Sequence, residues 1–309
     1  MGKIIRRRST HSIPTTLSST IEPCIGCLFL DSGAHSLYTK QVIKKKHAKG
    51  YDFYESAEFY AYVDDYIEFI KKHKQAIDHF VNVDVIFNPE KSWEMLKYME
   101  KAGLKPLPVI HWGTDLKWIK KHLDAGYDFI GLGGLGQEVS VAQYHEWADK
   151  VYEYLCPKPS CLPIVKTHGF AMTAYELMIK WPWFSVDSAS WVKAGGFGQI
   201  FVPHKRGGKF TFGVKPYNIS VSAESPSKSQ KGKHVYTISK GELKVVKEWL
   251  EQIDMPYGSV DKDGEEVEYG VTSNHAARKI ANLKFFQGLI DWLPKWPWPF
   301  RGSSQKGFF

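Results

Sequence analysis

Three aspartates stand at or near the ends of short apolar runs, which is where parallel strands present their functional groups. Asp31 directly follows CLFL, Asp84 lies within HFVNVDVI, and Asp187 closes WFSVD. A carboxylate can attack an anomeric carbon while a second carboxylate moves a proton on the leaving group. Because one such Asp is also an ordinary turn or helix-capping residue, only the convergence of all three predicts this chemistry.

Small and polar residues next to these aspartates, and after other apolar runs, are suited to holding a ligand. The glycines of GLGGLG let a backbone N–H approach a flat ligand because no Cβ intervenes, although a tight turn explains them equally well. Three of them also have the G-x-G-x-x-G spacing of dinucleotide-binding proteins, but they do not lie in the βαβ unit that begins such a fold. The predicted substrate-binding residues are Ser32, Gly33, Asp84, His111, Gly133, Gly134, Leu135 and Ser188, beside the predicted catalytic residues Asp187 and Asp31.

Histidine and cysteine provide weaker signals. His35, His111 and His168 could act as bases, ligands or satisfied polar groups, and we rank them below the aspartates. The chain has four Cys, in a C-x-x-C at 24–27 and flanking PKPS at 156–161. A structural zinc would require both pairs to meet with tetrahedral geometry, and the second spacing is loose. Free thiols in a reducing cytoplasm are therefore the default expectation, with no metal and no redox cofactor.

The positive charge is local and favours a polyanionic partner. The formal net charge is +8, and the basic residues gather near the N-terminus, around residues 40–49, at 205–209 and in the Ser-rich stretch SAESPSKSQKGKH. Nucleic acid is the first candidate, and a solvated basic surface is the alternative. The predicted nucleic-acid-binding residues are Lys205, Arg206, Lys228, Lys231 and Lys233.

Composition excludes several classes of protein. Hydrophobic residues make up 43% and charged residues 24% of the chain, which rules out disorder as its main state. No run approaches the roughly 18 apolar residues of a membrane span. The basic start MGKIIRRRSTHSIPTT has no apolar segment behind it, so we expect no secretory signal and a cytoplasmic protein.

Apolar runs alternate with helical patterns along most of the chain. Helices are predicted at about 57–72, 89–103, 116–126, 141–155, 174–180, 240–253 and 274–292. Strands are predicted at 25–30, 79–86, 107–111, 129–132, 163–166, 183–187, 199–202 and 209–214. A helix in SASWVKAGGFG is doubtful because the connection is short and Gly-rich.

Eight strands with intervening helices predict a (β/α)8 TIM barrel, with the active site at the carboxyl ends of the strands. The barrel is expected over residues 1–217, including a basic segment at 1–20. Residues 218–309 are expected to form a mobile basic loop, 218–234, and a C-terminal helical extension with the hairpin SVDKDGEEVEYG.

Three of these segments, taken together, resemble a known family. FLDSGAHS resembles the motif that opens the active site of queuine-type tRNA-guanine transglycosylases, LGGLG resembles their base-binding Gly-Gly-Leu, and SVDSASW stands where they carry a nucleophilic Asp. The combination, with HGF, is closer to phage DNA-guanine transglycosylases of the DpdA type. The resemblance covers about residues 25–205 and implies a pentosyltransferase that exchanges guanine in DNA for a free, preQ0-like 7-deazaguanine.

The resemblance also implies roles for individual residues. Asp187 is the implied nucleophile, Asp31 handles the proton of the base, and Asp84 recognises the base. Gly133, Gly134 and Leu135 match the Gly-Gly-Leu. The family's base-contacting Gln has no clear match, and His111 lies near that position. The C-x-C-x-x-C zinc cluster of the tRNA enzymes is missing, because no Cys follows Cys161.

Three other functions remain open on the sequence. A tRNA-guanine transglycosylase would use the same chemistry on RNA. A barrel glycoside hydrolase would use the same carboxylates on a carbohydrate, with sugar-stacking Trp at its mouth and a less basic surface. A non-catalytic nucleic-acid-binding barrel would keep the basic clusters and tolerate loss of Asp187.

Overall fold

The computed structural model describes residues 28–44, 52–134, 139–172, 174–226 and 228–302, and these fall into two compact units. The first unit contains the described residues up to 172, together with 181–187 and 296–302. The second contains 174–180 and 188–295. Residues 188–217, which we expected in the barrel, therefore group with the second unit, and this differs from the predicted boundary at residue 217.

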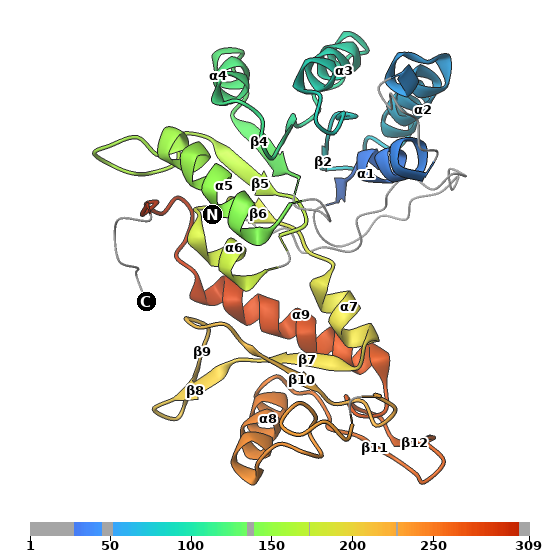
Figure 1. Ribbon diagram of the computed structural model, residues 1–309, viewed down its shortest axis with the longest axis vertical. Helices are drawn as coiled ribbons and strands as arrows, with labels where there is room; N and C mark the ends of the chain where they lie inside the picture. The colour runs from blue at the N-terminus through green and yellow to red at the C-terminus, as the bar shows by residue number, and fades with distance from the viewer. Residues whose placement is uncertain (1–27, 45–51, 135–138, 173, 227, 303–309) are drawn as a thin grey trace. The chain divides into compact units, whose positions relative to one another are not determined.

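Strands and helices alternate along the first unit (Figure 1), which confirms the predicted α/β class. The strands are β1 (Phe29–Leu30), β2 (His79–Phe80), β3 (Val109–His111), β4 (Phe129–Gly133), β5 (Lys166–Gly169) and β6 (Ser185–Val186). The helical segments are α1 (Ala34–Leu37), η1 (Tyr38–Lys44), η2 (Asp52–Glu55), α2 (Ala57–Lys72), α3 (Pro89–Lys101), α4 (Leu116–Asp124) and α5 (Val141–Leu155). Helices α2 and α5 have the predicted bounds.

Side-chain caps determine where the long helices of this unit begin. The side chains of Ser56, Asn88, Asp115 and Ser140 each accept a hydrogen bond from a backbone N–H in the first turn of α2, α3, α4 and α5. Each cap satisfies a donor that the helix itself leaves unpaired. Pro89 opens α3, where its missing N–H costs nothing. The strand-to-helix connections are therefore defined by sequence, and the strand ends are held in place.

The strands of the first unit pair in parallel and in chain order. Strands β3, β4, β5 and β6 form one parallel sheet, and β1 pairs in parallel with β2. A parallel bridge between Val81 and Leu107 connects the segment after β2 to the segment before β3. The carboxyl ends of all six strands consequently point in the same direction.

This set of strands is strongly curved. Leu28 and Leu30 pack outward against α2 and α3, whereas Phe29 points to the opposite face and packs with Val81 and Val109. The Phe29 ring stacks on His168 of β5, with the ring centroids 4.4 Å apart. Strands β1 and β5 are four positions apart in the pairing order, so in a flat sheet, at about 4.8 Å per position, they would be about 19 Å apart. The contact between their side chains therefore requires the sheet to curve. The concave face therefore forms an inner core layer, and α2 and α3 cover the convex face (Figure 1).

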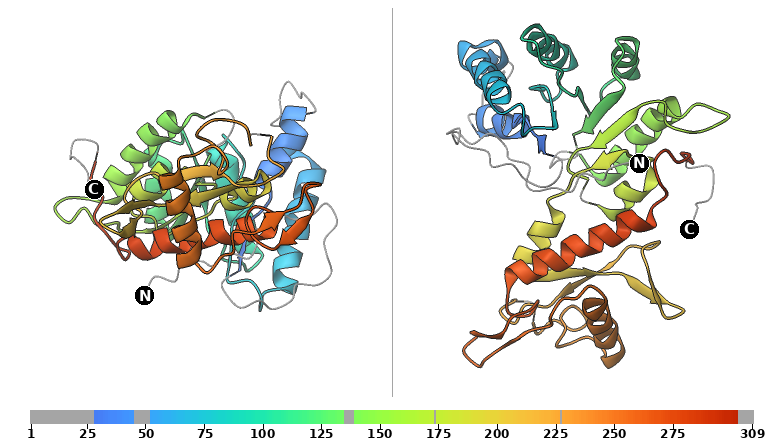
Figure 2. Two further views of the ribbon diagram at one scale, coloured as in Figure 1. Left: turned by 90° about the horizontal axis from the view of Figure 1, so that it is seen from below. Right: turned by 180° about the vertical axis from the view of Figure 1, so that it is seen from behind.

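Among its described residues, the second unit contains short antiparallel strand pairs and four helices (Figure 2). Its strands are β7 (Gln199–Val202), β8 (His204–Arg206), β9 (Lys209–Thr211), β10 (Tyr217–Ser220), β11 (Ser259–Val260) and β12 (Glu266–Glu268). Its helices are α6 (Tyr175–Lys180), α7 (Ser190–Gly196), α8 (Lys240–Gln252) and α9 (His275–Trp292). The pairs are β7–β10, β8–β9 and β11–β12, and the last of these is the predicted hairpin.

Two predicted barrel strands are paired differently from our expectation. Gln199–Val202 and Lys209–Thr211 are strands, but they pair antiparallel with β10 and β8. The chain between residues 202 and 209 is short. A parallel strand neighbour needs a crossover connection of a dozen or more residues, whereas an antiparallel hairpin needs a turn of only two residues. Gly207 and Gly208 supply that two-residue turn with φ of 55° and 80°.

Helix α7 occupies the Gly-rich connection in which a helix was doubtful. A Cβ on Gly195 would lie 2.9 Å from the backbone nitrogen of Lys279 in α9, so this glycine permits close packing of the two helices. Asn282 of α9 is fully buried and donates to the carbonyls of Trp191 and Gln199. The side chains of α9, not local propensity, therefore stabilise α7.

The Ser-rich stretch 218–234, predicted as a mobile loop, is anchored at both described ends. Its first residues form β10, and Ser220 bridges in parallel to His234. His234 is fully buried, and its Nε2 lies 2.9 Å from the Ser222 carbonyl oxygen. The buried, hydrogen-bonded histidine therefore anchors the end of the stretch, while Lys228, Lys231 and Lys233 lie on the surface.

Candidate active site

A cavity of about 330 Å³ opens in the first unit at the carboxyl ends of the parallel strands. This volume lies within the range of pockets for small ligands, about 300–1,000 Å³. Asp31, Asp84 and Asp187 all line it, so the structure brings together the three aspartates that the sequence singled out. Other residues that line the cavity include Tyr38, Phe87, Val109, His111, Gly133, Gly134, Val139 and Phe170.

Asp31 reaches the cavity because it follows β1 on the same side as Phe29. Side chains alternate along a strand, so the residue two positions after an inward Phe also points inward. The Gly33 N–H lies 3.4 Å from Asp31 Oδ1 and starts the turn into α1. Gly33 has a φ of 75°, a left-handed conformation in which a side chain would be strained. The DSG segment therefore holds the Asp31 carboxylate next to a backbone donor.

Asp84 is buried and accepts two side-chain hydrogen bonds. The Ser32 hydroxyl donates to Oδ1 at 3.2 Å, and His111 Nε2 lies 2.5 Å from Oδ2. Ser32 is itself fully buried. The order of contacts is serine, aspartate, histidine, whereas a serine nucleophile needs the histidine in the middle. This group therefore orients Asp84 and does not activate Ser32.

Two tyrosines beneath the aspartates were not identified from the sequence. Tyr62 donates to the Ser32 carbonyl oxygen at 2.5 Å, and Tyr66 donates to the carbonyls of Leu30 and Val81. Burial, and then the negative charges of Asp31 and Asp84, raise the pKa of the Tyr62 hydroxyl far above its ordinary value. The same causes raise the pKa of Tyr66. Both tyrosines therefore stay protonated and act as hydrogen-bond donors. In the sequence they belong only to the apolar stripe of a predicted helix, a pattern that indicates burial and not a position near a functional site.

His111 and the two glycines form one wall of the cavity through strand register. His111 of β3 pairs directly with Gly133 of β4. A Cβ at Gly133 would lie 3.6 Å from His111 Nδ1, an ordinary contact, so glycine here leaves space beside the imidazole. At Gly134, φ is 96° and a Cβ would lie 2.6 Å from the Trp112 nitrogen, so only glycine fits. Leu135 lies outside the described residues.

Asp187 follows β6 and is held by backbone groups of the segment after β5. It is 9% exposed, and its own N–H donates to the Gly169 carbonyl at 3.0 Å. The Ala171 N–H donates to Asp187 Oδ1, and Ala171 adopts a φ of 54° that is unusual for a residue with a side chain. The carboxylate is therefore fixed at the cavity. The neighbouring Ser188 hydroxyl pairs with the Ser190 hydroxyl at 2.6 Å, and its predicted role in substrate binding stays a prediction.

The other two candidate histidines differ in their surroundings. His35 of α1 lines the cavity and is exposed. His168 lies in the inner core layer, stacked on Phe29, with its Nδ1 2.8 Å from the Ser185 hydroxyl. Its aromatic and hydrogen-bonding contacts give His168 a structural role.

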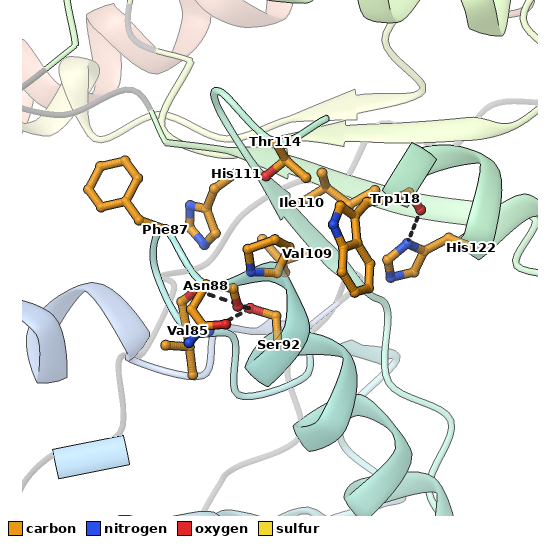
Figure 3. A pocket seen from close by; sticks show the side chains of 11 residues that line it. Val85, Phe87, Asn88, Ser92, Val109, Ile110, His111, Thr114, Trp118 and His122 are labelled. Carbon is orange, nitrogen blue, oxygen red and sulfur yellow. Dashed lines mark hydrogen bonds between the residues drawn. The ribbon is translucent and has the colours of Figure 1, made fainter. Parts of the chain in front are cut away.

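A much smaller pocket of about 10 Å³ shares a wall with the large cavity (Figure 3). Phe87, Val109 and His111 line both. On its far side Trp118 and His122 close the pocket, and His122 Nδ1 lies 2.6 Å from the Trp118 carbonyl oxygen. This space is about the size of one water molecule and holds no larger ligand.

The predicted nucleic-acid-binding residues belong to the second unit. Arg206 is exposed at the end of β8, and the three lysines of the Ser-rich stretch are exposed as well. Lys205 is different, because its Nζ forms an ion pair with Glu248 at 2.8 Å and lies over the Phe210 ring. This contact lowers the pKa of the Glu248 carboxyl. Lys205 therefore stabilises the packing of β8 against α8, whereas Arg206 carries its charge at the hairpin turn.

Within the described ranges, no group of three His, Cys, Asp or Glu side chains is arranged to hold a metal ion. Cys156 and Cys161 are free thiols there, and burial raises the pKa of Cys156 to about 12. The C-x-x-C pair at 24–27 lies outside the described residues. None of the described helices has the length and apolar character needed to cross a bilayer.

Comparison with protein-family models, with curated proteins and with solved structures gave no match.

Proposed function

We propose that this chain is a guanine transglycosylase that exchanges guanine in DNA for a free 7-deazaguanine through a covalent intermediate on Asp187. One observation carries the proposal: three carboxylates, from segments that follow three different strands, line a single cavity that two glycines also line. The motif order DSGA, GLGGL and SVDSASW, which resembles guanine transglycosylases, supports the same assignment.

The two displacements assign a role to each carboxylate. Asp187 attacks C1′ of a flipped-out deoxyguanosine; the C1′–N9 bond breaks, and guanine leaves with the electron pair and takes a proton from Asp31, whose carboxyl is protonated for this step. In the second step, N9 of the incoming base attacks C1′, its proton returns to Asp31, and the Asp187 carboxylate is released. Protons and bonds balance, and the sugar keeps its configuration after two inversions.

The contacts of Asp187 suit it to the nucleophilic role. The backbone N–H of Ala171 orients one carboxylate oxygen of Asp187 without neutralising its charge. Asp84 is less suited, because both of its oxygens already accept hydrogen bonds, from Ser32 and from His111. Asp84 is instead placed to accept hydrogen bonds from the edge of a base.

The walls of the cavity favour a heteroaromatic base over a carbohydrate. Apart from the aspartates and the histidines, the lining consists largely of aromatic and aliphatic side chains, among them Tyr38, Phe87, Val109, Val139 and Phe170. A sugar needs polar partners for several hydroxyl groups, whereas a purine offers two apolar faces and a polar edge. This observation counts against a glycoside hydrolase.

We also propose that the first unit is a barrel of the (β/α)8 type. Its six parallel strands follow one another in chain order, which a doubly wound sheet with its reversal point does not do. The contact between β1 and β5 across the concave face supports closure.

The basic surface of the second unit is the proposed contact to the polynucleotide. The exposed residues Arg206, Lys228, Lys231 and Lys233 would bind phosphates without sequence choice. Each phosphate contact is expected to contribute about −0.9 to the slope of log affinity against log salt for duplex DNA. An affinity that is independent of salt would remove this part of the proposal.

Incubation with labelled preQ0 tests the function directly. The protein is mixed in separate reactions with duplex DNA, single-stranded DNA and tRNA, and the nucleosides of each polymer are then analysed. Label in DNA supports the proposal, and label only in tRNA makes the chain a tRNA-guanine transglycosylase. No label in any polymer, together with salt-dependent binding, would favour the non-catalytic nucleic-acid-binding barrel.

A further inference from the structure

Phe87 occupies a turn position that normally requires glycine. The Asn88 N–H donates to the Val85 carbonyl at 3.0 Å, which closes a four-residue turn after Asp84. Among residues 85–88 only Phe87 has a positive φ, of 62°. Turns with this pattern favour Gly or Asn at the third position, because a bulky side chain there is strained.

The fold makes little use of the Phe87 ring. The turn is held by other groups: Ser92 Oγ accepts from the Val85 N–H at 2.8 Å and donates to the Val85 carbonyl at 3.1 Å. The Asn88 side chain caps α3. These bonds involve no atom of the ring, and Phe87 is 39% exposed. Glycine at this position would keep the turn and remove the strain.

The ring instead lies at the cavity, on the same wall as the candidate base-binding residues. Phe87 and His111 both line the cavity, and both line the smaller pocket beside it (Figure 3). The Tyr38 ring meets Phe87 edge-on, with the centroids 6.0 Å apart and an interplanar angle of 76°. An edge-on neighbour fixes the orientation of a ring without covering both of its faces.

We propose that Phe87 is a stacking platform for a flat nitrogen heterocycle whose polar edge is bound by Asp84, three residues earlier in the same turn segment. A strained backbone persists where the surroundings impose it, and such strain gathers at ligand sites. Here the strain places an aromatic face at the cavity mouth next to a buried carboxylate. That the heterocycle is guanine or a 7-deazaguanine rests on the proposed function.

Three variants separate stacking from folding. Phe87→Gly removes the ring and the strain, Phe87→Leu removes the aromatic face and keeps the strain, and Phe87→Tyr keeps both. Binding of free guanine and 7-deazaguanine to the full chain is measured by calorimetry, and the melting midpoint is recorded for each variant.

Base affinity should fall roughly 5- to 100-fold in Phe87→Gly and Phe87→Leu, which is the range that loss of one stacked aromatic produces. Phe87→Tyr should bind as the wild type does. The melting midpoint of Phe87→Gly should be unchanged or higher. Equal affinity in the Gly and wild-type proteins, or a midpoint lowered by more than about 5 °C, would overturn the assignment.

The outcome for the wild type distinguishes this inference from the proposed function. If the wild type binds neither base and exchanges none, the proposed function fails. If it binds and exchanges both bases while Phe87→Gly and Phe87→Leu do so equally well, the transglycosylase assignment stands and only the stacking role of Phe87 is lost.

Discussion

Asp84 Oδ2 and His111 Nε2 lie 2.5 Å apart, linking the segment after β2 to the last residue of β3. An ionised carboxylate only accepts hydrogen bonds, so Nε2 carries the hydrogen of this contact, and in the neutral imidazole Nδ1 is then an acceptor. Nδ1 is buried, and it has no hydrogen-bond partner among the described residues. It lies beside the space that Gly133 leaves open. A ligand on this wall therefore meets an imidazole whose orientation and tautomer are both determined by Asp84.

The first prediction concerns Asp84→Asn. An amide keeps one acceptor oxygen and replaces the other by a donor, so it cannot accept from both Ser32 and His111. We expect the free energy of unfolding to fall by about 1–3 kcal/mol, measured by urea denaturation, because a buried polar group loses its partner. Base affinity should fall as well. Ser32→Ala removes only one of the two hydrogen bonds and should lower the free energy of unfolding by less. Equal decreases in the two variants would show that the bond between Asp84 and His111 does not contribute to stability.

The second prediction contrasts two neighbouring glycines. A Cβ at Gly133 contacts His111 and Val109 at 3.6–3.7 Å, so Gly133→Ala should fold normally and still reduce base binding by filling the cavity wall. Gly134→Ala would force a Cβ to 2.6 Å from a backbone nitrogen at a φ of 96° and should unfold at a lower temperature. Melting midpoints and calorimetric base binding check both variants. Normal base affinity in Gly133→Ala would show that the ligand does not approach this wall.

The third prediction is a dependence of stability on alkaline pH. Burial and the charges of Asp31 and Asp84 raise the pKa of Tyr62. Above about pH 10 the unfolded chain loses this proton and the folded chain keeps it, so the free energy of unfolding falls as pH rises. Tyr62→Phe should cost about 1 kcal/mol at neutral pH through its lost hydrogen bond, and flatten the alkaline decline. An unchanged pH profile would mean that Tyr66 or other buried tyrosines dominate this decline.

Local signals in the sequence were sufficient for much of the fold. The helices at 57–72 and 141–155 were predicted with the bounds that α2 and α5 have, because the helical spacing of apolar residues is a local pattern. The three aspartates were identified because parallel strands place their carboxyl ends together, a rule that needs no knowledge of contacts.

Features that depend on partners distant in sequence were not predictable. The fifth strand is Lys166–Gly169 and not 163–166, because pairing with Phe129–Leu132 selects the later residues and Pro163 lacks an N–H for the ladder. Tyr62 is part of the site only because α2 packs under β1. The strain at Phe87 and Ala171 arises from tertiary constraints that a periodic pattern does not contain.

The fourth prediction concerns proton transfer by Asp31. Asp31→Asn keeps the size of the side chain and the acceptor for the Gly33 N–H, but it cannot take a proton from the incoming base. Base exchange should slow by roughly 10²- to 10⁴-fold, while binding of the polynucleotide is retained. Single-turnover exchange with labelled 7-deazaguanine measures the effect. Wild-type exchange rates in Asp31→Asn would reduce this residue to a cap of the turn into α1.

The fifth prediction concerns the nucleophile. Asp187 is almost fully buried at the cavity, and the Ala171 N–H fixes one of its oxygens, so the carboxylate is positioned to attack a sugar carbon. We expect a covalent link between the protein and DNA that survives denaturation, and that free 7-deazaguanine discharges. Asp187→Asn should abolish this band and reduce exchange by at least roughly 10³-fold, because an amide is a poor nucleophile and a poor leaving group.

Controls separate this outcome from a binding defect and from the rival functions. Asp187→Asn should keep salt-dependent DNA binding, since the proposed phosphate contacts are made by basic residues of the second unit. A glycoside hydrolase would form its adduct with a sugar substrate and release it to water, whereas a binding protein would form no adduct at all. If Asp187→Asn exchanges bases at the wild-type rate, Asp84 becomes the next candidate, although its two hydrogen bonds to Ser32 and His111 would then have to break before attack.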